Sequence, residues 1–280
     1  MKKLLSLILC LSVIAGLNAA DANWKIHPIF DEEVSHVIET PDYVYFTSRN
    51  MMENTAADAL FSLFRYDKKG DELMVLSTSN ILNGNTINDV VYNPSKGYVA
   101  VLYKDYTIDL LHNDGSVSYI PYYSMSDVPY SMNVNSMTID EGNDRLYLAT
   151  DFGYVAINDK RNEVAESRIY GEPLKSICRM GGHYIIVKEN EILSHSVSQP
   201  NLSLDGYKSQ ISLEGTVRFV LPLSDTVCIM VTGNKNMGSV RKLYFEGDEL
   251  KDETLFTTKL YNIENHQEGL LQLLGLIHIK

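Results

Sequence analysis

A short hairpin pattern recurs five times along the sequence and constrains the fold more than any other feature. Each copy has an apolar run, a turn of Pro, Gly, Asn or Asp, and a second run rich in β-branched and aromatic residues, as in two antiparallel strands. Spacings of about 40 to 53 residues separate the equivalent points Val37, Val90, Met137, Ile177 and Phe219. A period near forty residues with strands alone is typical of propeller blades. The sequence therefore predicts an all-β fold, a β-propeller of four-stranded antiparallel blades, about five of which are recognisable.

The third copy contains Asp151, Phe152 and Gly153, the tripeptide that holds magnesium in protein kinases. A kinase also needs a Gly-rich phosphate loop, a strand lysine paired with a helix glutamate, and a His-Arg-Asp catalytic loop. The sequence has none of these. We interpret the tripeptide as a tight turn between the second and third strands of a blade, because Gly accepts a positive φ and Asp can bond its own backbone.

The domain boundaries follow from the repeats. We expect a signal peptide over residues 1–20, the propeller domain over 21–257, and a C-terminal tail or partial blade over 258–280. Either five blades close as a small ring, with the segment 22–30 completing one of them, or the ring is unfinished. An unfinished ring would leave unpaired strand edges, which promote aggregation.

The N-terminus has the pattern of a secretory signal. Lys2 and Lys3 precede an apolar run from Leu4 to Leu17, and Ala19 and Ala20 supply the small residues of a cleavage site. No later segment has the roughly twenty consecutive apolar residues of a membrane-spanning helix. We expect an exported protein, in the periplasm or at the outer-membrane surface, without a transmembrane segment in the mature chain.

The charge of the chain excludes some partners. The net charge is -12, and it becomes about -14 once Lys2 and Lys3 are removed. Such a surface repels nucleic acid. Beyond the signal peptide only Cys178 and Cys228 remain. Both adjoin strand-like apolar residues, so we expect buried thiols rather than a disulfide.

The sequence offers no motif for catalysis. The seven histidines lack metal-binding spacings. There is no GxSxG elbow, and no pair of carboxylates is singled out by spacing. We therefore predict no cofactor, no metal, no catalytic residue and no enzymatic activity.

Tyrosines indicate a binding surface. Tyr122, Tyr123 and Tyr130 crowd the segment that links the second repeat to the third. Such links share one rim of a propeller with the turns that carry Tyr106, Asp151 and Asn190. These six residues are the candidate binding residues, since tyrosine pairs a flat apolar face with a polar tip and suits sugar rings or protein surfaces. The alternative is that the tyrosines merely fill strand positions.

The stretches "TIDLLHNDGSV", "INDVVYN" and "LYLATDFGYVAIND" resemble the PorZ-type β-propeller domain of Bacteroidetes. The resemblance extends from about Trp24 to Gly171. It implies an accessory component of the type IX secretion system at the outer membrane, working beside the cell-surface sortase and binding an anionic lipopolysaccharide. PorZ-like proteins also carry a second propeller and a C-terminal secretion domain. This sequence shows neither, which suggests a truncated or divergent paralogue.

The sequence is compatible with three functions. The first is a non-enzymatic exported propeller that binds a protein or a lipopolysaccharide-type glycan and assists type IX secretion and cell-surface attachment. The second is an extracytoplasmic glycan-sensing propeller of a two-component regulator system. The third is a propeller glycan lyase or hydrolase, which predicts carboxylates or histidines converging on the central channel.

Overall fold

The computed structural model describes residues 34–49, 61–121, 131–198, 208–213, 215–233 and 237–259. The chain divides into two units, Met1–Asp31 and Glu32–Lys280, and every described residue belongs to the second. The predicted signal peptide over 1–20, the segment 22–30 and the residues beyond Lys259 lie outside the described residues.

The described residues form twenty strands in five sheets of four. Blade 1 contains β1 (Val34–Glu39), β2 (Tyr43–Arg49), β3 (Phe61–Asp67) and β4 (Glu72–Leu76). Blade 2 contains β5 (Ile87–Asn93), β6 (Tyr98–Tyr103), β7 (Ile108–His112) and β8 (Val117–Ile120). Blade 3 contains β9 (Val134–Asp140), β10 (Arg145–Thr150), β11 (Gly153–Asn158) and β12 (Glu163–Ile169). Blade 4 contains β13 (Ser176–Met180), β14 (His183–Val187), β15 (Glu191–Ser196) and β16 (Lys208–Ser212). Blade 5 contains β17 (Thr216–Ser224), β18 (Val227–Gly233), β19 (Met237–Glu246) and β20 (Glu249–Lys259).

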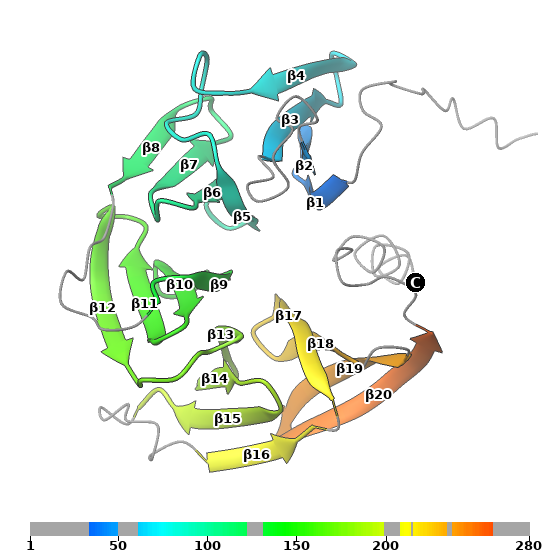
Figure 1. The fold of residues 1–280 in the computed structure, drawn as a ribbon. Helices are drawn as coiled ribbons and strands as arrows, with labels where there is room; N and C mark the ends of the chain where they lie inside the picture. The colour runs from blue at the N-terminus through cyan, green and yellow to red at the C-terminus, as the bar shows by residue number, and fades with distance from the viewer. Residues whose placement is uncertain are drawn as a thin grey trace, which may run out of the picture. The chain divides into compact units, whose positions relative to one another are not determined.

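Each blade is an antiparallel meander of consecutive strands, and the blades follow one another around a common centre (Figure 1). The first strands of the blades, β1, β5, β9, β13 and β17, are innermost and contact one another in chain order. The five equivalent points of the repeat lie on these strands. No sheet closes on itself, as in an incomplete propeller. The predicted fold class is confirmed.

Burial explains why the blades stack. The inner strands β6, second in blade 2, and β11, third in blade 3, are buried along their whole length, whereas the outermost strands β4, β8 and β12 are largely exposed. On β10, Leu146 and Leu148 join a core shared with blade 2, while Tyr147 and Ala149 join a core shared with blade 4. Because side chains alternate between the two faces of a strand, one strand supplies two interfaces, and no blade could bury both its faces alone.

The Asp151–Gly153 tripeptide forms the predicted turn between the second and third strands of blade 3. Thr150 pairs with Gly153 across the turn, and Phe152 is completely buried in the core between blades 2 and 3. Gly153 has φ of 145°, and a Cβ there would lie 2.1 Å from the carbonyl oxygen of Arg168. The turn is therefore a packing element of the propeller.

The two cysteines meet at the interface between blades 4 and 5. Cys178 on β13 and Cys228 on β18 are both buried and free, with their Sγ atoms 3.8 Å apart. A hydrogen bond between the thiols, together with burial, raises the pKa of Cys178 well above its usual value. The prediction of buried thiols agrees with this arrangement.

Candidate functional site

A cavity of about 330 Å³ lies where the innermost strands converge. All five of these strands contribute to its lining, so residues far apart in the sequence meet there. Among the described strands, each innermost strand has a strand partner on one edge only. The propeller architecture thus creates a cavity that no single blade could form.

Apolar side chains form most of the wall. The strands β1, β5, β9 and β17 contribute the lining residues Val37, Ile38, Val90, Val91, Met137, Ile139, Val220, Leu221, Pro222 and Leu223. Several of these, including Ile38, Val91 and Leu221, stay only partly buried. Apolar side chains usually pack fully at the centre of a domain, so this surface is available to an apolar group of matching size.

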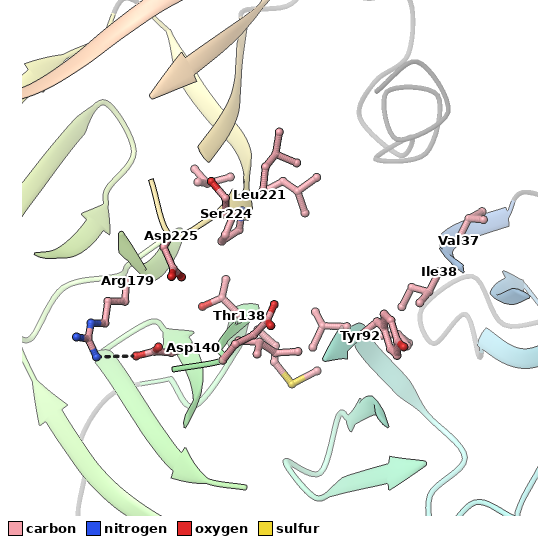
Figure 2. Close-up of a pocket in the computed structure, with 17 residues that line it drawn as sticks. Val37, Ile38, Tyr92, Thr138, Asp140, Arg179, Leu221, Ser224 and Asp225 are labelled. Carbon is pink, nitrogen blue, oxygen red and sulfur yellow. Dashed lines mark ion pairs between the residues drawn. The ribbon is translucent and has the colours of Figure 1, made fainter. Parts of the chain in front are cut away.

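One end of the cavity is polar. Figure 2 shows Arg179 of β13 beside Asp140 at the end of β9, with Asp225 close to both, while Val37 and Ile38 of β1 lie on the far side of the lining. A guanidinium nitrogen of Arg179 lies 3.5 Å from Oδ2 of Asp140, whose side chain is 7% exposed. Asn143 donates to both oxygens of this carboxylate, at 2.9 and 2.8 Å. These bonds offset the cost of burying the Asp140 charge.

Two further carboxylates, Glu141 and Asp225, line the same end. Neither side chain has a hydrogen-bond or ion-pair partner within the described ranges. The backbone of Asp225 is held, since its carbonyl accepts a hydrogen bond of 2.5 Å from Gly181 N–H. Three carboxylates and one guanidinium therefore line this end, which leaves it net negative.

The polar end opens into a second hollow of about 230 Å³. Asp140, Arg179 and Asp225 line both spaces. The rest of the hollow is lined by Met180 at the end of β13 and by the turns that follow β9, β13 and β17, through Gly142, Asn143, Gly181, Gly182 and Thr226. Gly182 has φ of 77°, and nothing lies within 4 Å of the position of a Cβ there. The turn at Gly182 therefore leaves space beside the hollow.

Polar contacts between blades hold the lining in place. Asp89 of β5 accepts a hydrogen bond of 2.8 Å from Met137 N–H and lies 3.4 Å from Nε2 of His36 on β1. Thr138 of β9 donates to the carbonyl of Ile177 on β13. Each contact joins a side chain of one innermost strand to the next blade. A site built on such strands is more rigid than one built on loops alone.

The structure places three of the predicted binding residues on equivalent turns between second and third strands. Tyr106 lies in the turn after β6, Asp151 in the turn after β10, and Asn190 in the turn after β14. The turns that line the 230 Å³ hollow connect first strands to second strands. The turns of Tyr106, Asp151 and Asn190 therefore lie at the opposite end of the second strands. Tyr122, Tyr123 and Tyr130 lie outside the described residues, so the predicted cluster is not described as a whole.

The three residues differ in their surroundings. Tyr106 packs partly buried against the core between blades 2 and 3, with φ of 67°. The carboxylate of Asp151 accepts hydrogen bonds of 3.0 Å from both Asn133 and Asn135. Burial acts to raise the pKa of Asp151, but the hydrogen bonds from neighbouring side chains outweigh it and lower the pKa. Asn190 is exposed. Their role in binding stays a prediction.

Sequence reasoning missed Asp140, Arg179 and Asp225. The available signal was the register of the repeat: Asp140 and Arg179 follow the equivalent points Met137 and Ile177 by a few residues, just before the first turn of the blade. A charged residue there breaks an otherwise apolar strand. Within the described ranges no group of three or more His, Cys, Asp or Glu side chains is arranged to hold a metal ion. Nor does any helix in that part of the chain have the length and apolarity to span a bilayer.

Comparison with solved structures supports the propeller fold. PorZ of Porphyromonas gingivalis, described as an essential bacterial surface component of the type-IX secretion system, is similar with a TM-score of 0.62 and 15% identity over 80% of this chain. The match covers 28% of the PorZ chain. Sqt1 from Chaetomium thermophilum gives 0.52, with 11% identity over 83% of this chain and 63% of its own. A chain of a nidogen/laminin complex gives 0.51, with 12% identity over 81% of this chain and 80% of its own. At such identities these likenesses show the fold alone.

The sequence itself points to a family. No curated protein matches it. The family model described as "TSS9, PorZ, N-terminal beta-propeller domain" matches residues 56–205, which span blades 2 and 3 together with β3 and β4 of blade 1 and β13, β14 and β15 of blade 4. Because this match covers more than half of the sequence, and the described strands form blades of the expected kind, the chain belongs to the PorZ N-terminal β-propeller family.

Proposed function

We propose that this protein is an exported, non-enzymatic β-propeller that binds a protein partner and has an accessory role in type IX secretion. The observation that carries the proposal is the combination of family membership with a central cavity lined by all five innermost strands. A cavity with apolar walls and a few polar groups at one end is the usual form of a recognition site. Fold alone does not decide function, so the proposal rests on this site and on the family.

The proposed location follows from the N-terminal sequence. Residues 1–20 have the pattern of a secretory signal, and PorZ of Porphyromonas gingivalis is described as a surface component. Both support an exported protein in the periplasm or at the outer-membrane surface. The match covers 28% of PorZ, so the proposed role is that of its propeller domain rather than of the whole protein.

A protein partner fits the site better than an anionic glycan. The cavity end carries Asp140, Glu141 and Asp225 against a single Arg179. An anionic lipopolysaccharide would meet net repulsion there, whereas a polypeptide can present cationic side chains. A glycan partner would therefore use another surface, such as the rim that carries Tyr106 and Asn190.

The carboxylates at the cavity favour a second candidate, a propeller glycan hydrolase. Such enzymes use a pair of carboxyl groups across the scissile bond. Asp140 suits this role poorly, because Asn143 and Arg179 occupy its oxygens. Glu141 and Asp225 would remain as the pair. Release of reducing ends from outer-membrane polysaccharide, abolished by Glu141→Gln, would favour the hydrolase over the binding protein.

The binding role is tested by affinity capture. The mature chain, residues 21–280, is immobilised and exposed to detergent-solubilised outer membranes of the host bacterium, with an unrelated propeller of similar net charge as the control. We expect enrichment of type IX secretion components, and deletion of the gene to reduce the secretion of type IX cargo. Recovery of neither protein nor glycan above the control, together with normal secretion in the deletion strain, would refute the proposal.

A further inference from the structure

The polar end of the 330 Å³ cavity and the 230 Å³ hollow in front of it are here called the acidic entrance, and they are continuous with the apolar part of the cavity. Asp140, Arg179 and Asp225 line both the 330 Å³ cavity and the 230 Å³ hollow in front of it. A group that enters from the hollow therefore passes the carboxylates before it reaches the apolar wall of β5, β9 and β17. A ligand that fills both spaces must combine a charged part with an apolar part.

The charge of the entrance determines the sign of the charge on the ligand. Asp140 is already neutralised in part by Arg179, and Asn143 satisfies its oxygens. Glu141 and Asp225 have no such partner in the described part of the chain. No lysine lines either space. Two uncompensated carboxylates beside an opening attract a cation and repel an anion.

The size of the cavity limits the apolar part of the ligand. A space of about 330 Å³ lies at the lower end of the range for small-molecule pockets. It can therefore enclose one or two aliphatic side chains but not a folded element. Its lining is aliphatic, with Tyr92 as its one aromatic residue. The wall therefore suits a leucine-like or methionine-like side chain.

From this geometry we infer that the cavity binds a peptide segment in which an aliphatic side chain is followed by lysine or arginine. The aliphatic side chain fills the cavity against Val91, Ile139 and Leu221, and the cationic group lies at the entrance beside Glu141 and Asp225. The inference rests on the proposed function, since it identifies the chemistry of the protein partner. It places binding at the end opposite to the turns of Tyr106, Asp151 and Asn190.

The probe is a short capped peptide with one leucine followed by two lysines, labelled with fluorescein. Binding to the mature chain is measured by fluorescence anisotropy at low and high salt. Two matched peptides carry glutamates in place of the lysines, or glycine in place of the leucine. We expect the lysine peptide to bind, the glutamate peptide not to bind, and the glycine peptide to bind about tenfold more weakly because it buries no aliphatic side chain.

Two double variants locate the binding. Glu141→Gln with Asp225→Asn removes the two unpaired charges, and we expect affinity for the lysine peptide to fall about threefold for each charge. Glu246→Gln with Asp248→Asn makes the same charge change where β19 turns into β20, at exposed residues that line neither space, and should leave affinity unchanged. Thermal unfolding of each variant shows whether it remains folded.

The outcomes separate this inference from the proposed function. Equal or tighter binding of the glutamate peptide, no binding of any peptide, or equal losses in both double variants would overturn the inference. Peptide binding at the cavity without capture of any secretion component would leave the inference standing and contradict the secretion role. Capture of a secretion component that is unaffected by the Glu141 and Asp225 changes would support the secretion role and refute this site.

Discussion

The ammonium group of Lys96, in the first turn of blade 2, lies 2.7 Å from Oδ1 of Asp159 in blade 3. The Asp159 side chain is completely buried, and its other oxygen accepts a hydrogen bond from the hydroxyl of Tyr98. Lys96 also lies 2.5 Å from Asp144. The two blades are thus joined by a buried charge as well as by their shared apolar core.

Removing the cation of this pair should destabilise the propeller. Lys96→Met leaves the buried Asp159 carboxylate without a counter-ion, and loss of one partner of a buried pair costs about 3 kcal/mol. Urea unfolding of the variant measures the change. Adding Asp159→Asn to Lys96→Met should restore part of the loss, because the uncompensated charge is then removed. A loss below about 1 kcal/mol in Lys96→Met would show that the pair behaves as a surface contact.

Alkaline pH should destabilise the protein. Burial raises the pKa of Tyr98, Tyr103 and Tyr147, and hydrogen bonds to Asp159, Asp109 and Tyr184 raise it further. The folded protein therefore holds these protons above about pH 10, where the unfolded chain releases them. The unfolded state then binds fewer protons, so stability is fully present below about pH 10 and falls as the pH rises further, by up to about 1.4 kcal/mol per pH unit for each tyrosine.

Urea unfolding at several alkaline pH values measures this slope. Tyr98→Phe should make the slope shallower, whereas Tyr119→Phe, at a residue that is 44% exposed, should leave it unchanged. Equal slopes in the two variants would contradict a role for the buried hydroxyl.

Gly153 should not tolerate a side chain. Its φ of 145° is strained for other residues, and a Cβ would collide with the carbonyl oxygen of Arg168. We expect Gly153→Ala to lose about 2 kcal/mol or more in thermal or urea unfolding. Gly115→Ala is the control, since Gly115 also has a positive φ, of 87°, but open space around it. A smaller loss in Gly153→Ala than in Gly115→Ala would show that the collision is relieved by movement of β12.

Asp89 should stabilise the propeller mainly by accepting the hydrogen bond from Met137 N–H. Asp89→Ala leaves Met137 N–H without its partner on the innermost strand of blade 3, at a cost of about 2 kcal/mol. Asp89→Asn keeps a carbonyl oxygen for that bond and should cost less. Urea unfolding compares the two variants. Equal losses would instead assign the effect to the contact with His36, which both changes weaken.

The repeat made most of the fold predictable. Val37, Val90, Met137, Ile177 and Phe219 recur at a nearly constant position in each copy, and each lies on an innermost strand. The turn at Asp151 could be predicted because a strand, a Gly-containing turn and a second strand are local in sequence. The cavity could not be predicted in this way, since Asp140, Arg179 and Asp225 come from three blades that only the tertiary structure brings together.

The sequence alone determined the number of recognisable blades, the order of the strands within them and the turn at Asp151–Gly153, because each of these depends on residues close together in the chain. Only the tertiary structure decided which residues face one another across blades. The charge pair of Lys96 and Asp159 and the acidic entrance beside Glu141 depend on how neighbouring sheets stack. Stacking is set by the packing of whole faces, which no local pattern of residues records.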